Sequence, residues 1–462
     1  MMGINLWINN LINKKANIAP LVVFRIIFGF MMAISTLRFI LKGWVEDLYV
    51  TPTYYFKYYG FDWVNPFDGP TMHLLFWVMF ACAILIMLGL FYRINIILYF
   101  LLFTYIELID KTNYLNHYYF ISCISFILMF LPANRSFSLD CFFGICQRKN
   151  YCSSWMINCI KLQIGIVYLY AGISKLNYHW LFEAEPLINW LKHLSDFPII
   201  GELLMFDTTA YVFSWFGAIF DLTIFFILIN NKYRIWGYLV VVIFHVFTSI
   251  MFPIGVFPLV MIASTLIFFS DNFHNKIIEF LSKLFFIKKE HSNSERYSYP
   301  SYSKKIIGII YVLFFTLQLL LPFRFLLYPG KLFWNEQGYR FSWRVMLIEK
   351  AGYAQFYVHE PKKDRKMLIN NKDYLTPQQE KMMATQPDMI LQYAHFLRDE
   401  FTDSLIVESN GEKIQLNKPK ITVDVRVSLF NKGSKVFVDP NVNLSNINRG
   451  FKHKDWILNY EN

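Results

Sequence analysis

Charged residues are scarce in this chain. Asp, Glu, Lys and Arg make up only 17% of its 462 residues, whereas 55% are hydrophobic and 19% are aromatic. A soluble domain of ordinary composition carries about 25% charged residues, so this class is excluded. The composition indicates a polytopic membrane protein.

Cysteine is also scarce, and none of it falls in the C-terminal part of the chain. The six residues lie in or beside the first five apolar segments: Cys82, Cys123, Cys141, Cys146, Cys152 and Cys159. This distribution argues against a disulfide framework. The spacings are not those of a zinc motif, so we expect no bound metal.

Several motifs of other enzyme classes are missing. The ten histidines are dispersed, with no pair at the three- or four-residue spacing of di-iron desaturases or zinc proteases. The sequence contains no glycine loop that would cradle a phosphate, and no nucleophile elbow. Nucleotide-dependent and serine-hydrolase chemistry are therefore excluded.

Long apolar runs are present instead. A bilayer core of about 30 Å requires about 20 apolar residues of helix. We predict nine transmembrane helices, over residues 18–40, 73–92, 94–109, 117–132, 159–175, 209–230, 233–250, 253–270 and 305–327. No cleavable signal peptide is expected before the first of them.

The net charge of +11 follows the predicted spans. Basic residues gather in alternate loops, such as Arg135, Arg148 and Lys149 between the fourth and fifth spans. The positive-inside rule places these loops in the cytoplasm. We therefore expect a cytoplasmic N-terminus, an extracytoplasmic C-terminal domain, and a lipid bilayer rather than nucleic acid as the partner.

The chain divides into four predicted parts. Residues 1–285 form a multi-span membrane domain with a catalytic cavity, and residues 286–304 form a basic cytoplasmic linker. Residues 305–330 are the last transmembrane helix, and residues 331–462 are an extracytoplasmic mixed α/β domain.

The last part contains patterns of a soluble fold. Thr376 and Pro377 open a predicted helix that reaches about Phe401, because proline is tolerated in a first helical turn. Residues 421–429 alternate between apolar and polar side chains, which predicts a half-buried strand. A turn at residues 431–434 leads to a predicted partner strand at 435–438.

Lys175 is the most informative residue, because it follows about four helical turns of almost uninterrupted apolar sequence. An ionisable residue in a membrane span is a functional candidate. A desolvated amine can stay neutral and act as a base or nucleophile. The alternative is a lysine at a helix end that extends to the lipid headgroups.

The predicted topology brings other polar residues to the depth of Lys175. Asn116 and His117 begin the fourth span at the outer face, and His245 lies near the outer end of the seventh. Histidines in such places can also cap a helix or form hydrogen bonds in a core. Other residues expected to line the same cavity are Glu107, Asp110, Tyr168 and Tyr170. A base beside an aromatic-rich cavity suits a lipophilic substrate or cofactor.

Two further charged residues in the spans are assigned structural roles. Asp221 lies in the middle of the sixth span and must be protonated or paired, and we expect a partner such as a helix hydroxyl. Arg25 lies near the cytoplasmic end of the first span, where it can extend to the headgroups.

Several blocks of the chain resemble the vitamin K-dependent gamma-carboxylase family. The block at the lysine reads Ala-Gly-Ile-Ser-Lys-Leu-Asn, with Trp180 five residues after the lysine. The other blocks follow the family's order and cover most of the chain: residues 87–94, 110–117, 244–245, 254–257, 319–322, Trp334 with Tyr339, 341–343 and 437–440.

The resemblance implies a coupled reaction. In the family, a lysine matched here by Lys175 deprotonates reduced vitamin K, and oxygen converts the anion to a strongly basic alkoxide that becomes the 2,3-epoxide. That base removes a gamma proton from a peptide glutamate, and the carbanion captures carbon dioxide. The expected cofactor is reduced vitamin K with O2 and CO2 as co-substrates and no metal, and the expected partner is a glutamate-containing protein or peptide.

The resemblance also implies roles for matching residues. Asn116 and His117 would position the quinol or the glutamate, Tyr168 would line the quinol pocket, and His245 would assist near the carboxylation centre. The segment implicated in holding the glutamate and the quinol is matched by Tyr339, Phe341, Ser342 and Trp343.

Departures from the animal pattern indicate a bacterial form in the cell inner membrane. Ser174 stands where animal members carry a second lysine, and His395 stands at the position of a cysteine of the animal disulfide. Two alternatives stay open. One is an enzyme that makes epoxide without carboxylating glutamate, and the other is a quinone- or peptide-binding membrane protein without turnover.

Overall fold

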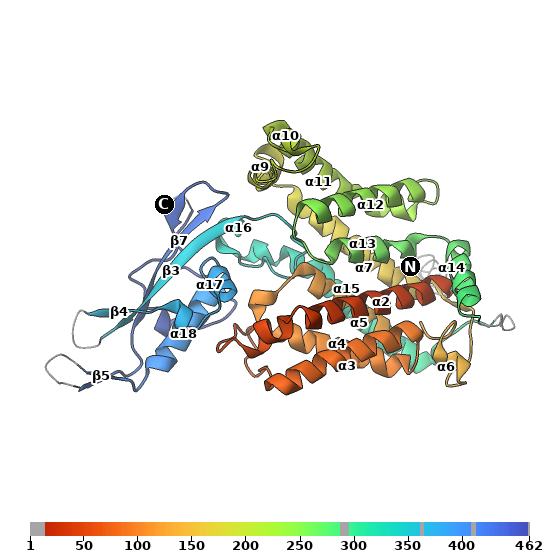
Figure 1. Cartoon of the computed structure of the whole chain (residues 1–462), viewed down its shortest axis with the longest axis horizontal. Helices are drawn as coiled ribbons and strands as arrows, with labels where there is room; N and C mark the ends of the chain where they lie inside the picture. Colours follow the sequence, from red (N-terminus) through yellow and green to blue (C-terminus); the bar gives the residue numbers. More distant parts are fainter. Residues whose placement is uncertain (1–13, 287–294, 361–364, 408–412, 461–462) are drawn as a thin grey trace, which may run out of the picture.

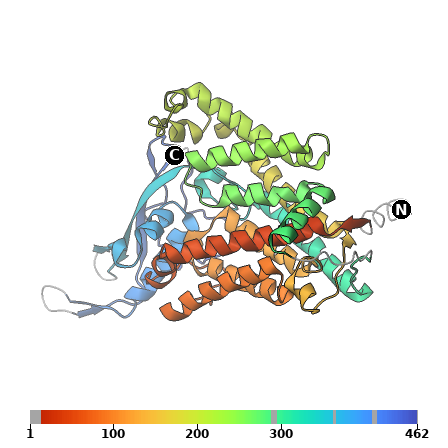
Figure 2. The same ribbon diagram turned by 45° about the vertical axis from the view of Figure 1, so that its right-hand side comes forward.

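The structure, a computed structural model, describes residues 14–286, 295–360, 365–407 and 413–460. Long helices run side by side along the longest axis of the molecule, and a domain with a β-sheet lies beyond one end of them (Figure 1). A view turned by 45° shows the same arrangement (Figure 2). The membrane domain and the C-terminal domain thus meet at one end of the helix bundle.

Seven helices of the described part are long and apolar enough to cross a membrane: α2 (Ala19–Leu41), α3 (Gly69–Leu88), α4 (Tyr92–Ile109), α7 (Ser154–Lys175), α11 (Asp207–Ile229), α12 (Arg234–Met251) and α15 (Ser301–Leu320) with its 3-10 extension η4 (Leu321–Leu327). Local caps fix some of their ends. The Asp68 carboxylate accepts the Thr71 amide at the start of α3, and Gly89 adopts a φ of 69° at its end.

All nine predicted spans are helical, but two of them are not full spans. The fourth, α5 (Asn116–Phe130), has only 15 residues. The eighth comprises α13 (Phe257–Thr265) and the 3-10 turn η3 (Leu266–Phe268), and the chain then bends by 114° into α14 (Asp271–Leu284). Polar residues begin at Asp271. The apolar stretch of α13 and η3 before it is therefore too short to cross a bilayer by itself. By length and composition, the described residues contain seven candidate spans, or eight if the bent pair is one span, where nine were predicted.

Short elements connect these helices. Strands β1 (Lys15–Asn17) and β2 (Tyr151–Ser153) pair antiparallel. The short helices of the membrane domain are η1 (Glu46–Val50), η2 (Lys111–Asn113), α6 (Leu139–Phe142), α8 (Tyr178–Phe182), α9 (Leu187–Lys192) and α10 (Gly201–Leu204).

Arg25 in α2 does not extend to the headgroups as the sequence suggested. It is buried, and its guanidinium donates hydrogen bonds to the carbonyls of Ala133 at 3.1 Å and Phe137 at 2.6 Å. These carbonyls follow α5, so Arg25 fastens the loop after α5 to α2. The position of Arg25 in its span could not show that backbone carbonyls of this loop would lie within hydrogen-bonding distance.

Helices α7 and α11 approach each other closely. A side chain on Gly172 of α7 would place its Cβ 2.8 Å from the backbone nitrogen of Leu222 in α11. Small residues at helix contacts permit such an approach. This contact brings Lys175, one turn after Gly172, next to Asp221.

The C-terminal domain is built on a four-stranded sheet in the order β4-β3-β7-β8. Its strands are antiparallel: β3 (Lys350–His359), β4 (Lys366–Leu368), β7 (Ile421–Leu429) and β8 (Ser434–Val436). The predicted strand over 421–429 and its turn to the next strand are confirmed. The long central partner β3 was not predicted.

Two helices and small elements complete this domain. They are α16 (Leu332–Asn335), η5 (Asn371–Asp373), α17 (Pro377–Met383), α18 (Pro387–Phe401), the hairpin of β5 (Leu405–Val407) and β6 (Lys413–Gln415), and η6 (Leu444–Asn446). Apolar residues of β3, β7 and α18 form its core, among them Phe356, Val425 and Tyr393.

The predicted helix from Pro377 to Phe401 is divided in two. A capping box of Thr376 and Gln379 sets the predicted start. The first helix ends at Met383 because Pro387 cannot continue it and disfavours helical geometry in the preceding residue. Of the predicted linker 286–304, residues 287–294 lie outside the described part, and its last residues are already helical, because α15 begins at Ser301.

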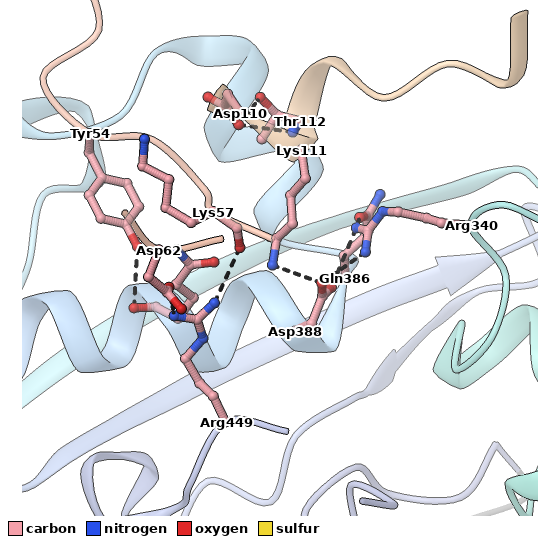
Figure 3. A network of polar contacts seen from close by, with 11 residues as sticks. Tyr54, Lys57, Asp62, Asp110, Lys111, Thr112, Arg340, Gln386, Asp388 and Arg449 are labelled. Carbon is pink, nitrogen blue, oxygen red and sulfur yellow. Dashed lines mark hydrogen bonds and ion pairs between the residues drawn. The ribbon is translucent and has the colours of Figure 1, made fainter. Parts of the chain in front are cut away.

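A polar network joins the two domains (Figure 3). The Asp388 carboxylate lies 2.8 Å from both Lys111 Nζ and Arg340 Nη1. Burial alone would raise the pKa of Asp388, but the charges of Arg340 and Lys111 hold it below its usual value. The Gln379 amide donates to Asp110 Oδ2 at 2.7 Å. Asp110 therefore belongs to this junction and not, as expected, to a cavity around Lys175.

Candidate functional site

A cavity of about 330 Å³ lies among α7, α11, α12 and the start of α13. Its walls are mostly aromatic and aliphatic. The residues with polar side-chain atoms among those lining it are Tyr168, Lys175, Trp180, Asp221, His245 and Thr248. A mostly apolar cavity with a few converging polar groups is typical of a small-molecule site.

Lys175 is the last residue of α7, and its ammonium is turned into this cavity. Its Nζ lies 2.7 Å from Oδ2 of Asp221 and 3.4 Å from the Ala171 carbonyl. The indole ring of Trp180 lies 5.2 Å from Nζ. The side chain is buried, so Lys175 does not extend to the headgroups.

Asp221, in the middle of α11, is the functional candidate that the sequence reasoning missed. Its partner is the ammonium of Lys175 rather than the helix hydroxyl that we expected. A usable signal was present, because two ionisable residues of opposite sign in separate spans tend to pair. The predicted topology indicated the depth of each residue but not the direction of its side chain around the helix.

Tyr168 and His245 lie together on another part of the cavity wall. The Tyr168 hydroxyl is 3.0 Å from His245 Nε2, and both side chains are buried. Tyr170, by contrast, points away and donates to the Leu319 carbonyl at 2.6 Å. The expectation that Tyr168 lines the cavity with Lys175 is met, whereas Tyr170 lies outside it.

Asn116 and His117, at the start of α5, do not line the cavity directly. The Asn116 amide donates to the Arg344 carbonyl at 2.8 Å. The ring of His117 lies 5.8 Å from the ring of Phe257, which does line the cavity. His117 is thus one side chain removed from the cavity, and Asn116 holds a segment of its wall.

That segment runs from Tyr339 to Met346 and contributes residues to two cavities. Trp343 is buried and stacks on Tyr119 with ring centroids 4.7 Å apart, and the Ser342 hydroxyl donates to the Tyr339 carbonyl. Val345 and Met346 line the cavity with Lys175. Trp343, Ser342 and Tyr339 do not line this cavity.

Phe341 faces a second cavity of about 270 Å³ between α4, α5 and α15. Its ring packs against those of Tyr114 and Tyr119 at 4.9 and 5.0 Å. Glu107 lines this second cavity, so it is not beside Lys175 as expected. The described residues include no cluster of three or more His, Cys, Asp or Glu side chains arranged to hold a metal ion.

Comparison with protein families matches two parts of the chain. Residues 13–273 match the HTTM domain, and residues 303–462 match the vitamin K-dependent gamma-carboxylase lumenal domain. The first match contains Lys175, Asp221 and His245, and the second contains the segment from Tyr339 to Met346. No solved structure matches the chain.

Proposed function

Because the chain belongs to the vitamin K-dependent gamma-carboxylase family, we propose that it couples the oxygenation of reduced vitamin K to the carboxylation of a peptide glutamate. The products would be the 2,3-epoxide and gamma-carboxyglutamate. The observation that supports this proposal most directly is the buried pair of Lys175 and Asp221 in an apolar cavity.

The cavity suits a quinol. Its volume of about 330 Å³ lies within the usual range of small-molecule sites, and aromatic side chains such as Phe244 and Phe257 provide flat walls. Lys175 and His245 would contact the polar edge of the ring. Reduced vitamin K, when bound, would supply the oxidisable hydroxyl groups, and O2 would be the oxidant.

Lys175 would serve as the base. An amine accepts a proton only in its neutral form, and an apolar cavity disfavours separated charges. Asp221 Oδ2 is 2.7 Å from Nζ, so the pair can transfer its proton from nitrogen to oxygen and leave the amine free. Asp221 also fixes the position of Nζ, which a flexible lysine side chain would otherwise not keep.

The surroundings of Lys175 would keep water away from the reaction. Trp180 covers the amine from one side, and its indole is anchored by a 2.8 Å hydrogen bond to the Ser214 carbonyl. A strongly basic species survives only where water is excluded. The ring of His245, hydrogen-bonded to Tyr168, would orient the quinol from another part of the wall.

Arg344 supports carboxylation of glutamate rather than epoxide formation alone. Its side chain is buried. Its Nε has no hydrogen-bond partner in the described structure, and the guanidinium lies 4.4 Å from the ring of Phe325. A buried guanidinium whose Nε donates to nothing favours an anion, and the gamma-carboxylate of a substrate glutamate is one. Asn116 holds the backbone of Arg344 in place.

The test is one reaction with two readouts. Purified protein in lipid nanodiscs is given reduced vitamin K, O2, labelled CO2 and a glutamate-containing peptide. We expect epoxide and labelled carboxyglutamate together. Epoxide without carboxyglutamate would reduce the function to quinol oxygenation, and neither product from folded protein would contradict the proposal.

A further inference from the structure

Two thiols lie close together at the end of the bundle opposite the sheet domain. Cys141 belongs to α6, which Figure 1 shows at that end, and its Sγ is 3.4 Å from Sγ of Cys146. The Asn134 carbonyl lies 3.3 Å from the first sulfur and 3.6 Å from the second. Both residues are partly exposed.

The loop that holds the thiols is well fixed. The carboxylate of Asp140 accepts the backbone amides of Phe91 and Tyr92 at the start of α4, at 2.7 and 3.2 Å. The Asn134 amide donates to the same carboxylate at 2.6 Å. These bonds anchor the residues beside Cys141 to the membrane domain, so the contact between the thiols follows from the fold of the loop.

The chemistry of the pair points to redox exchange rather than metal binding. A structural zinc site uses four ligands, and no third His, Cys, Asp or Glu joins the two thiols among the described residues. The hydrogen bond from the Cys146 thiol, with help from Ser138, Arg135 and Arg148, lowers the pKa of the Cys141 thiol to about 6. The thiolate is the attacking form in disulfide exchange.

We propose that Cys141 and Cys146 form a reversible disulfide by exchange with a low-molecular-weight disulfide. The Cys141 thiolate attacks one sulfur of the small disulfide and releases one small thiol, leaving a mixed disulfide on Cys141. The Cys146 thiolate then attacks Cys141 Sγ and releases the second small thiol. The protein dithiol is oxidised by two electrons, and the small disulfide is reduced to two thiols.

The geometry permits the second step without unfolding. A disulfide bond is about 2.0 Å long, so the two sulfurs must approach by little more than an ångström, which side-chain rotation can supply. The bond would link α6 to the turn that follows it. That turn belongs to the loop that also binds Arg25 through the carbonyl of Phe137.

The test uses the full-length protein in lipid nanodiscs, equilibrated with mixtures of reduced and oxidised glutathione. After an acid quench, free thiols are alkylated with N-ethylmaleimide and the protein is digested with trypsin. Cleavage after Arg135 and Arg148 leaves both cysteines, and no other, in the peptide 136–148. We expect this peptide to change from two alkyl groups to an internal disulfide as the oxidised share rises, and to recover both alkyl groups after reduction.

Cysteine variants and the buried cysteines provide the controls. Cys146→Ser should stop the reaction at a glutathione adduct on Cys141. The buried thiols of Cys82 and Cys123 should react with N-ethylmaleimide only after the protein is denatured. Two alkyl groups on the peptide at every glutathione ratio, or independent glutathione adducts on both cysteines of the wild type, would overturn the proposal.

Discussion

Nζ of Lys175 in α7 lies 2.7 Å from Oδ2 of Asp221 in α11, and each side chain is only 7% exposed. Replacing a buried ion pair with apolar residues is often neutral or stabilising, so stability alone does not explain why an apolar cavity contains one. The proposed role in proton transfer would explain it. Under that proposal, the pair would place a base and a second proton acceptor at one point of the cavity wall.

Asp221→Asn should reduce quinol oxygenation strongly. The amide cannot take up the lysine proton or hold Nζ as the carboxylate does, so Lys175 would lose both its proton acceptor and its fixed position. We expect epoxide formation to fall by about 10²- to 10⁴-fold, as for loss of a catalytic base. Asp207→Asn is the matched control, because Asp207 begins the same helix and pairs with Lys192 on the surface. A normal rate for Asp221→Asn would remove Asp221 from the mechanism.

Tyr168→Phe should weaken the reaction without abolishing it. The change removes the 3.0 Å hydrogen bond that orients His245. A buried hydrogen bond contributes about 1 kcal/mol, so a loss of about 5- to 10-fold in kcat/KM for the quinol is expected. Tyr170→Phe loses a hydroxyl outside the cavity and should keep the wild-type value. Equal effects of the two changes would argue against a special role for Tyr168.

Gly172→Ala should separate α7 from α11. The added Cβ would lie 2.8 Å from the backbone nitrogen of Leu222, which cannot move as a side chain can. The expected result is a lower melting temperature together with lower epoxide formation, because Lys175 moves away from Asp221. Gly308→Ala in α15 is the control, since nothing lies within 4 Å of its added Cβ. Unchanged melting of Gly172→Ala would contradict the close packing described.

Arg344→Gln should separate the two halves of the reaction. Loss of a charged hydrogen bond costs about 1.5–3 kcal/mol, so the KM for the glutamate peptide should rise by about 10- to 100-fold. Epoxide formation measured without peptide should stay close to wild type. Arg344→Lys keeps the charge and should restore part of the affinity. If both halves fell together in Arg344→Gln, the residue would be supporting the fold.

Asp388→Asn should loosen the junction between the domains. It leaves Lys111 and Arg340 without their shared carboxylate. Because Asp388 is 35% exposed, we expect a discounted loss of about 1–3 kcal/mol, visible as a lower melting temperature and faster proteolysis of the C-terminal domain. Gln378→Ala, which removes an exposed amide bonded to Asn113 across the same junction, is the control.

The pH dependence of the junction follows from the same carboxylate. The pKa of Asp388 is held below its ordinary value of 3.8 by Arg340 and Lys111, although partial burial opposes this shift. The unfolded state therefore binds more protons as the pH falls below about 3.8, and the contribution of Asp388 to stability is lost there. Above that pH the contribution is fully present. Melting curves of wild type and Asp388→Asn should converge in strong acid and differ near neutral pH.

The sequence predicted the parts of this structure that depend on local pattern. Apolar length located the seven long helices of the membrane domain, and strict alternation located β7. The parts that depend on tertiary contacts were missed. The pairing of Asp221 depends on which faces of α7 and α11 meet. Gly172 lies at that contact, where it permits the close approach of the two helices. Asn116 and His117 share the depth of Lys175, but the ring of Phe257 and the backbone of Arg344 stand between them and the cavity.

Boundaries were missed for physical reasons as well. The break before Pro387 divides a helix whose apolar pattern continues across it. β3 was not predicted, because only half of it has the alternating burial of a typical strand. Its first half is exposed on both faces, with three consecutive exposed residues from Ala351 to Tyr353. The pairing of β3 with β7 rather than its own pattern defines the strand.

The most direct test of the account is epoxide formation from reduced vitamin K and O2 by three proteins in lipid nanodiscs: wild type, Lys175→Ala and Lys161→Ala. Lys161 lies in the same helix near its other end, outside the cavity. The account predicts epoxide from wild type and Lys161→Ala and almost none from Lys175→Ala, with all three proteins folded. Equal epoxide formation by wild type and Lys175→Ala would contradict it.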